Sequence, residues 1–416
     1  MRIAILSLLF NWPSKGGGAT HTAELVRFLT LAGYRVRHIF ATHVPWQIGN
    51  ISTPLPYDGY ALELTSQEWT PSGIQNSFRR AVDEFSADVV LITDCWNFKP
   101  WLAEAMAGYR VIWRMQAQED LCPLNNLRLI TDGKHVRQCG YHQLVNRTEC
   151  LACLKERGSL SGWLHQSERA LSAVDTPRYN SLLSQTLRQA EAVLVLNRQI
   201  KAHFEPHVNN VQVVPWGMDP TRFPATPTPP GAVVGRPLRL LFAGIPQEGI
   251  KGLEVLHSAC HRLWMKRRDF ELLVTGEPAE QVAPWVRSIG WQAQSDLPAV
   301  YMASDIVVVP TVAQDGLSRV SVEAMACARP VIASDIGGLP ETVTDGVTGL
   351  LVPPGDPEAL SERLNDLMDH PIRRTRLGQN GRHRFEACFT WQHVVTRYYI
   401  PLFGTSHWDS TRIGAL

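Results

Sequence analysis

The feature that most constrains this fold is an alternation of short apolar runs with helical patterns, which occurs twice along the chain. In the first half, the apolar runs are residues 2–9, 34–40, 87–92, 109–113, 192–196 and 211–214. Helical patterns, such as residues 19–32 and 101–107, lie between them. Strands that alternate with helices form a parallel sheet covered by helices on both faces. The first half is therefore predicted to be a doubly wound α/β domain.

A proline-rich segment at residues 223–231 interrupts this pattern. Its four prolines remove backbone donors and fix φ, so we interpret it as a linker between domains. The alternation then begins again, with apolar runs at residues 238–243, 270–274, 305–310 and 330–333 and helical patterns at residues 252–265, 318–328, 357–368 and 373–388. Two such domains are expected to leave a ligand cleft at the carboxyl ends of their strands.

Composition excludes several classes of protein. A chain of 416 residues with 44% hydrophobic residues is too long for one core and too apolar for disorder. Its 40 basic and 39 acidic residues lack the basic excess of a nucleic-acid binder, and the small basic clusters indicate at most peripheral membrane contact. The amino-terminal apolar run is too short for a signal peptide, so a cytoplasmic location is expected. The oligomeric state is not indicated.

Two glycine-rich turns are candidates for ligand contact. Gly16, Gly17 and Gly18 lie between the first strand and the first helix, and Gly244 precedes Lys251 at the corresponding place in the second half. Glycines let a backbone approach a ligand, and a lysine before a helix suits a phosphate. Taken alone, the first turn is more simply explained as a plain tight turn, and Lys251 as a surface lysine.

Two carboxylates follow a strand of the second half at a fixed spacing. Asp315 lies in a polar, glycine-bearing loop, and Glu323 lies eight residues later among apolar helical residues. A buried carboxylate needs hydrogen-bonding partners, and we expect ligand hydroxyls to supply them for Glu323. A second glycine turn at Gly337 and Gly338 then leads into another helix, which again suits phosphate.

Together these motifs resemble the retaining glycosyltransferases of family 4, which have the GT-B fold. Asp315 and Glu323 match the carboxylate–x7–carboxylate signature of the family, and Gly337, Gly338 and Glu341 match its glycine-glycine-x-x-glutamate stretch. Residues 214–219 and the turn at Gly17 and Gly18 are similar to further family motifs in the same order. The resemblance is closest over residues 238–360.

The resemblance implies a fold, an activity and roles for residues. It implies two Rossmann-like domains facing across a cleft: residues 1–222, joined by the returning tail 389–416, would bind the acceptor, and residues 236–388 the donor. A sugar would pass from a UDP- or GDP-sugar to a small-molecule or glycan acceptor, with retention of configuration and without a catalytic metal. Glu323 would hold the ribose, Asp315 the donor sugar and Lys251 the diphosphate.

Further residues are expected on each side of the site. The donor side would include Gly244, Gly276, Gly290, Trp291, Gly316, Leu317, Ser318 and Arg319. The acceptor side would include Gly17, Gly18, His21 and Gln116. A related subgroup has a histidine where this chain has Gln116, and an amide cannot act as a base near neutral pH. Another group, with His21 as one candidate, would then activate the acceptor, unless the alignment is shifted by a few residues.

Four cysteines form a separate cluster within the insert at residues 116–154. Cys122, Cys139, Cys150 and Cys153 include a CxxC pair and resemble the Cys-rich insert of the same subgroup. We expect a structural zinc ion, because tetrahedral coordination would order a loop too polar to fold alone. Two disulfides, free thiols and an iron–sulfur cluster are the alternatives.

Two other classes of function fit the same domains. A GT-B phosphorylase or a sugar-nucleotide epimerase would use the same cleft for different chemistry. A non-catalytic protein would bind a nucleotide sugar without turning it over. A donor-hydrolysis assay separates these classes.

Overall fold

A computed structural model describes residues 1–14, 16–132, 135–223, 235–276 and 283–404. Most of the predicted linker, residues 224–231, lies outside this described part. The chain divides into two compact units. The first comprises residues 1–128, 139–217 and 394–416, and the second comprises residues 129–138 and 218–393. The sequence expectation placed the boundaries at residues 222, 236 and 388, whereas the units divide between residues 217 and 218 and between 393 and 394. Residues 129–138 of the insert, expected in the first domain, belong to the second unit.

The first unit contains a seven-stranded sheet in the order β3-β2-β1-β4-β5-β8-β9. All of its pairings are parallel. The strands are β1 (Arg2–Ser7), β2 (Arg35–Thr42), β3 (Gly59–Glu63), β4 (Val89–Ile92), β5 (Arg110–Arg114), β8 (Ala192–Val195) and β9 (Val211–Val213). The chain reverses its direction of travel across this sheet between β1 and β4, which is the switch point of the sheet.

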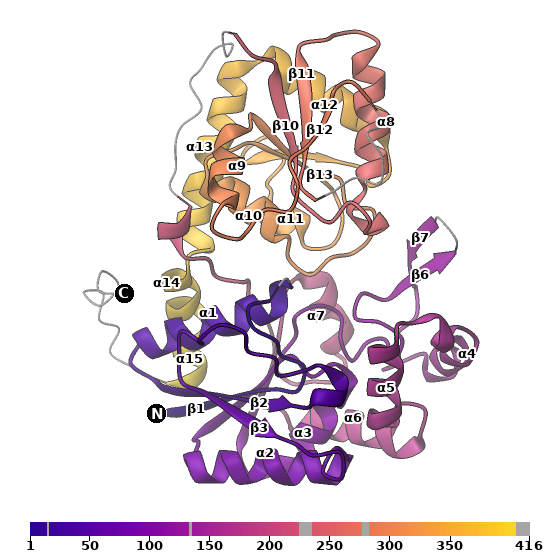
Figure 1. Ribbon diagram of the computed structural model, residues 1–416, viewed down its shortest axis with the longest axis vertical. Coiled ribbons are helices and arrows are strands. Elements are labelled where there is room, and N and C mark those ends of the chain that lie inside the picture. Colours follow the sequence, from indigo (N-terminus) through magenta and orange to yellow (C-terminus); the bar gives the residue numbers. More distant parts are fainter. Residues whose placement is uncertain (15, 133–134, 224–234, 277–282, 405–416) are drawn as a thin grey trace. The chain divides into compact units, whose positions relative to one another are not determined.

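Helices cover both faces of this sheet (Figure 1). The helices of this unit are α1 (Gly17–Leu31), α2 (Pro71–Phe85), α3 (Lys99–Ala105), α4 (Arg147–Arg157), α5 (Trp163–Ser172), α6 (Pro177–Gln189) and α7 (Arg198–Phe204), of which α4 and α5 lie to one side of the sheet. Local sequence explains where several of them begin. Thr70 and Thr176 accept hydrogen bonds from backbone N–H groups of α2 and α6, and each is followed by a proline at the first helical position, a favoured combination at helix starts.

The second unit contains a six-stranded parallel sheet in the order β12-β11-β10-β13-β14-β15. Its strands are β10 (Leu238–Phe242), β11 (Phe270–Val274), β12 (Val286–Ser288), β13 (Ile306–Val309), β14 (Val331–Ser334) and β15 (Gly349–Val352). Here the switch point lies between β10 and β13. Both sheets therefore have the doubly wound topology that the alternating pattern predicted.

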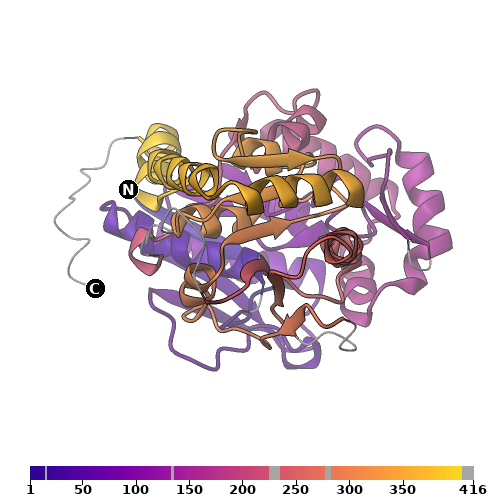
Figure 2. The same ribbon diagram turned by 90° about the horizontal axis from the view of Figure 1, so that it is seen from above.

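The helices of the second unit pack in two groups. They are α8 (Leu253–Trp264), α9 (Leu297–Ala303), α10 (Arg319–Ala326), α11 (Leu339–Thr342), α12 (Pro357–Asp369) and α13 (Pro371–Cys388). Helix α8 packs against α12, and α10 packs against α13. Helices α12 and α13 also contact the edge strand β15, and Figure 2 shows them beside the strands from above. The apolar core of this unit lies between α8, α12 and the strands.

The carboxyl-terminal segment returns to the first unit. It consists of α14 (Trp391–Val394), a π-helical turn (Val395–Tyr399) and α15 (Ile400–Phe403). Within the first unit, the Tyr34 ring packs against Phe403, and its hydroxyl donates to the carbonyl of Gly404 at 2.8 Å. Residues 405–416 of the predicted tail lie outside the described residues.

A short antiparallel hairpin occurs inside the Cys-rich insert. Its strands are β6 (Leu129–Asp132) and β7 (His135–Gln138), and by its contacts it belongs to the second unit. Throughout the part of the chain that the structure describes, no helix is both long and apolar enough to cross a membrane.

Candidate functional site

Lys251 and Asp315 lie together at the switch point of the second sheet. Lys251 ends the 3₁₀ helix Gly249–Lys251 after β10, and Asp315 lies in the loop after β13. The Nζ of Lys251 donates to Oδ2 of Asp315 at 3.0 Å, and the backbone N–H of Gly316 donates to Oδ1 at 2.8 Å. Because open α/β sheets bind ligands at switch points, this pair lies where a ligand is expected.

The electrostatics of this pair keep the lysine charged. Burial lowers the pKa of Lys251, but the charge of Asp315 and the hydrogen bond to it more than offset this, so the pKa is raised above its usual value. The side chains of Lys251 and Asp315 are 31% and 28% exposed, so a ligand can reach them. A charged, reachable ammonium group at a strand-to-helix turn suits a phosphate or diphosphate.

The loop after β14, which carries Gly337 and Gly338, packs against the same site. A Cβ atom at Gly338 would lie 2.0 Å from the carbonyl oxygen of Gly316, and one at Gly337 would lie 2.7 Å from the carbonyl oxygen of Asp315. Only glycine allows such an approach between two backbones. The glycine pair therefore packs the loop after β14 against the loop that carries Asp315.

Helix α10 places Glu323 behind this loop. Ser318 caps the helix through its hydroxyl, and the neighbouring Leu317 is buried. Glu323 is 3% exposed; it accepts a hydrogen bond from the Tyr301 hydroxyl at 2.7 Å, and the Nε of Arg319 lies 3.5 Å from its other oxygen. Ligand hydroxyls are therefore not needed to satisfy this carboxylate, which corrects the argument made from its burial in the sequence.

The other predicted donor residues line the neighbouring loops of the second unit. The backbone N–H of Gly244 donates to Oγ1 of Thr275 at 2.8 Å, which ties the loop after β10 to the end of β11. Gly276 and Gly290 form an isolated backbone bridge, and Trp291 after it is 58% exposed. The structure thus places Gly244, Gly276 and Gly290 on adjoining loops, and leaves the Trp291 ring accessible.

In the first unit, Gly18 and Gln116 lie together at the corresponding switch point. A Cβ at Gly18 would lie 2.7 Å from Oδ1 of Asp94 and 3.6 Å from Cγ of Gln116. Gly17 begins α1, directly after the glycine turn. Three segments far apart in sequence therefore meet here, namely the turn after β1 and the ends of β4 and β5.

Gln116 is held by hydrogen bonds at both ends of its amide. Its Nε2 donates to Oγ1 of Thr93 at 2.7 Å, and its Oε1 accepts from the indole N–H of Trp216 at 3.1 Å. Its backbone N–H donates to the carboxylate of Glu119. Gln116 is 8% exposed. These contacts indicate that Gln116 holds Thr93, Trp216 and Glu119 in position.

The structure corrects the expectation for His21. The residue is fully buried, its ring stacks on Trp216 with centroids 5.6 Å apart, and the Nε of Arg114 lies 3.4 Å from its Nε2. It lies on the inner side of α1, so a bound acceptor does not reach it. His21 does lie on the helix that follows the glycine turn, but its side chain is on the buried face of that helix.

Asp94 is a residue that the sequence argument missed. It follows β4 and is only partly buried. Burial, the largest influence, and the charge of Glu119 raise the pKa of Asp94 to about 6, against the opposing effects of Thr22 and Lys99. The signal was present in the sequence, because a polar residue directly after an apolar strand of a parallel sheet lies at its ligand-binding edge.

The four clustered cysteines lie close enough to influence one another's pKa values. Burial raises the pKa of the Cys150 thiol to about 12, and the charges of Cys122, Cys139 and Cys153 add to this effect. All four are free thiols. Among the described residues, no group of three or more His, Cys, Asp or Glu side chains is placed to hold a metal ion. The zinc site therefore stays a prediction.

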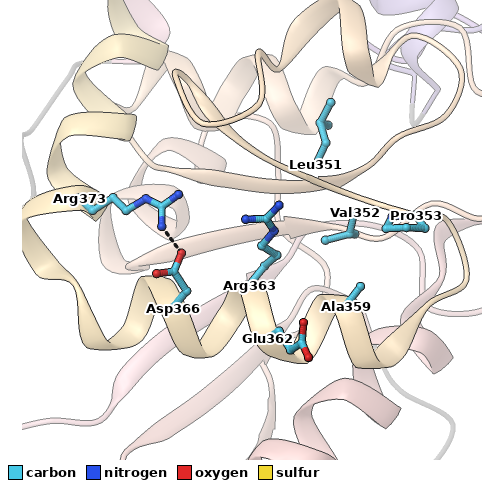
Figure 3. Close-up of a pocket in the computed structure, with 8 residues that line it drawn as sticks. All are labelled: Leu351, Val352, Pro353, Ala359, Glu362, Arg363, Asp366 and Arg373. Carbon is cyan, nitrogen blue, oxygen red and sulfur yellow. Dashed lines mark hydrogen bonds and ion pairs between the residues drawn. The ribbon is translucent and has the colours of Figure 1, made fainter.

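A pocket of about 440 Å³ lies elsewhere in the second unit, beside the edge strand β15 (Figure 3). Its lining residues are Leu351, Val352, Pro353, Ala359, Glu362, Arg363, Asp366 and Arg373. Arg373 and Asp366 form an ion pair across one end of it. None of the predicted donor residues lines this pocket, and it does not lie at the switch point, so we do not assign the donor to it.

Comparison with known proteins supports the assignment of the second unit. The family described as "Glycosyl transferases group 1" matches residues 237–370, which include both Lys251 and Asp315. Residues 237–370 of the second unit are therefore similar to a group 1 glycosyltransferase domain. The match does not extend to the insert at residues 116–154, so membership of a Cys-rich subgroup stays a prediction.

The curated proteins that are similar to this chain have names that describe different reactions. The chain is 34% identical over 228 residues to the GDP-mannose-dependent monoacylated alpha-(1-6)-phosphatidylinositol monomannoside mannosyltransferase of Corynebacterium glutamicum, covering 48% of this chain and 58% of the relative. It is 35% identical over 219 residues to the alpha-maltose-1-phosphate synthase of Mycolicibacterium smegmatis, covering 45% and 55%. The chain thus spans little more than half the length of these relatives.

Solved structures match nearly the whole chain. The sucrose-phosphate synthase of Thermosynechococcus elongatus has a TM-score of 0.66 at 20% identity and covers 97% of this chain and 99% of its own. HepE of Anabaena in complex with UDP has a TM-score of 0.65 at 16% identity, with the same coverage. These matches confirm the predicted fold, two Rossmann-like α/β domains of the GT-B type.

Proposed function

We propose that the protein is a retaining glycosyltransferase that moves a hexosyl group from a UDP- or GDP-sugar to the hydroxyl of an acceptor. The observation that carries this proposal is the Lys251–Asp315 pair at the switch point of the second sheet, 3.0 Å apart and reachable by a ligand. The pair lies within the segment that matches the group 1 family. Among the similar proteins, one is named for GDP-mannose and another was solved with UDP-glucose.

The proposed chemistry follows from the charges. As the bond between the anomeric carbon and the diphosphate breaks, negative charge grows on the leaving diphosphate. A cation already held in place stabilises that charge without reorganisation. Lys251 supplies this cation, since its contact with Asp315 maintains its charged form. Asp315 faces the donor sugar in this proposal, and Glu323 holds the ribose from α10.

The first test is a screen of donors. UDP-glucose and GDP-mannose are added separately to the protein, and thermal unfolding is followed. A donor present at 100 times its Kd raises the free energy of unfolding by about 2.7 kcal/mol. Proton NMR of the products then shows whether the transferred sugar keeps its α configuration. A β-linked product would contradict retention, and absence of both binding and transfer would reject the function.

A non-catalytic protein that binds nucleotide sugars is the second candidate. Its supporting observation is that Gln116 stands where a related subgroup has histidine and that its amide is already bonded to Thr93 and Trp216. Such a protein would show the thermal shift without product.

A cytoplasmic location also stays a prediction.

We propose separately that Cys122, Cys139, Cys150 and Cys153 hold a structural zinc ion. The mutual effects of these thiols on their pKa values support a common site, and zinc would bind them as thiolates and remove their repulsion. Elemental analysis should find about one zinc per chain, and Cys150→Ser should lose it. Metal-free protein with four thiols that react freely in the native state would contradict this proposal.

A further inference from the structure

The carboxyl end of β4 carries a carboxylate whose two oxygens have different surroundings. Oδ2 of Asp94 accepts a hydrogen bond from the Thr22 hydroxyl at 2.7 Å and lies 3.4 Å from the Thr93 hydroxyl. Oδ1 points toward Gly18, where a Cβ atom would lie 2.7 Å away. Within the described residues, no protein group donates a hydrogen bond to Oδ1. One oxygen is therefore anchored and the other is open beside the glycine turn.

This open oxygen lies at the switch point of the first sheet. Asp94 follows β4, and Gly18 lies in the first turn of α1, after β1. Switch points are where open α/β sheets bind ligands. Gly18 has no side chain to cover Oδ1, and Asp94 remains partly exposed. A ligand hydroxyl can therefore approach Oδ1 over the glycine turn.

Lys99, whose charge lowers the pKa of Asp94, forms its own contacts with other groups. Lys99 is fully buried; its Nζ lies 3.6 Å from Oδ2 of Asp120 and donates to the carbonyl of Arg114 at 3.3 Å. Asp94 therefore has no direct ion pair among the described residues. The charged or titratable groups that face it are Glu119, Lys99, Tyr57, Arg114 and Cys95.

We infer that Asp94 binds the acceptor hydroxyl through Oδ1 and takes its proton during transfer. This inference rests on the proposed function. The acceptor oxygen forms a bond to the anomeric carbon, and the bond from that carbon to the diphosphate breaks with its electron pair leaving on the nucleoside diphosphate. The hydroxyl proton passes to Oδ1 and then to solvent. His21 is buried and the Gln116 amide is not basic, so neither of these two residues can take this role.

The protonation behaviour of Asp94 agrees with this role. A general base is most effective when its pKa is near the working pH, and burial raises the pKa of Asp94 to about 6. The carboxylate form is then present at neutral pH and lost as the pH falls through about 6.

The test compares Asp94→Asn with wild type and with Asp88→Asn. Asp88 precedes the same strand at its opposite end and is exposed, so its variant is the matched control. Donors are UDP-glucose and GDP-mannose, acceptors are methyl α-D-glucopyranoside, methyl α-D-mannopyranoside and water, and the readouts are turnover, its pH profile and the affinity for UDP and GDP.

Asp94→Asn should lose about 100-fold or more in turnover, the range of general-base catalysis, with unchanged affinity for UDP and GDP. The fall in kcat/KM of wild type below about pH 6 should be absent from the variant, and Asp88→Asn should behave as wild type. Asp94→Ala should be partly rescued by formate, which supplies an external carboxylate. Turnover of Asp94→Asn within threefold of wild type would overturn the inference alone. A wild-type protein inactive with both donors would reject the proposed function itself.

Discussion

The two sheets share the doubly wound topology, but their switch points carry different charged groups. In the second unit, Lys251 and Asp315 neutralise each other at 3.0 Å, and the pKa of the lysine is raised. In the first unit, the hydrogen-bond partners of Asp94 among the described residues are hydroxyl groups, and its pKa is raised to about 6. A cation held at one site suits a diphosphate that gains charge. A carboxylate with no ion pair to the residues that the structure describes, at the other site, suits a hydroxyl that loses a proton. The same fold thus supports two complementary tasks.

The largest effect is expected at Lys251. Lys251→Ala should lower kcat by about 10²- to 10³-fold, the usual cost of removing a preorganised group that stabilises developing charge. Substrate affinity should change less, because the charge grows toward the transition state. Steady-state kinetics with Lys266→Ala, an exposed lysine of the same unit, as control would measure this. A loss confined to KM would make Lys251 a binding residue only.

Glu323→Gln should have the next largest effect. Removing a charge-assisted hydrogen bond costs about 1.5–3 kcal/mol, which is about 10- to 150-fold in donor affinity. Calorimetry would measure this loss, and Tyr301→Phe is the control, since it removes one hydrogen bond between Glu323 and the protein but leaves the carboxylate in place. If Glu323→Gln binds UDP and GDP as wild type does, Glu323 only holds Tyr301 and Arg319.

Two glycine variants would sharpen the comparison of the switch points. A Cβ at Gly338 meets a backbone oxygen at 2.0 Å, whereas one at Gly18 meets the end of the Asp94 side chain at 2.7 Å. Gly338→Ala should therefore lower the free energy of unfolding by about 1–3 kcal/mol, as overpacking does. Gly18→Ala should melt closer to wild type but lose turnover, because it displaces Asp94. Equal melting temperatures for the two variants would show instead that the loop around Gly338 can shift at little cost in stability.

The pH dependence of stability should differ between the units. Burial raises the pKa of Asp94 to about 6, and those of Asp120 and Glu168 to about 7. The folded first unit then binds more protons than the unfolded chain, so its stability should fall as the pH rises from about 4 to 7. Lys251, with a raised pKa, contributes equally across this range. Hydrogen exchange resolved by peptide would show whether β4 and β5 lose protection while β10 and β13 do not.

The sequence predicted the central strands of both sheets and the edge strand β9, but it missed the other edge strands and much of the insert. Strands such as β1, β4, β11 and β13 are buried and read as continuous apolar runs, which is typical of parallel sheets. The edge strand β3 is mostly exposed, with the sequence Gly-Tyr-Ala-Leu-Glu, and carries no such signal. Helices α4 and α5 lie in a polar segment whose pattern offered little guidance.

The sites were predictable to a similar, partial degree. Lys251 and Asp315 were found because glycines and fixed spacings surround them. The hydrogen bond from Tyr301 to Glu323 joins two different helices, and spacing along the chain says nothing of such a contact. Asp94 and Gly18 are likewise brought together only by the order of the strands, which the sequence alone does not specify.

One measurement tests the division of tasks most directly, namely calorimetric titration of UDP and GDP into wild type, Lys251→Ala and Asp94→Asn. Lys251→Ala should bind the nucleotide more weakly than wild type, because the diphosphate loses its cation, while Asp94→Asn should bind it unchanged. Weaker binding by Asp94→Asn than by Lys251→Ala would place the nucleotide at the first switch point and contradict the roles proposed for both residues.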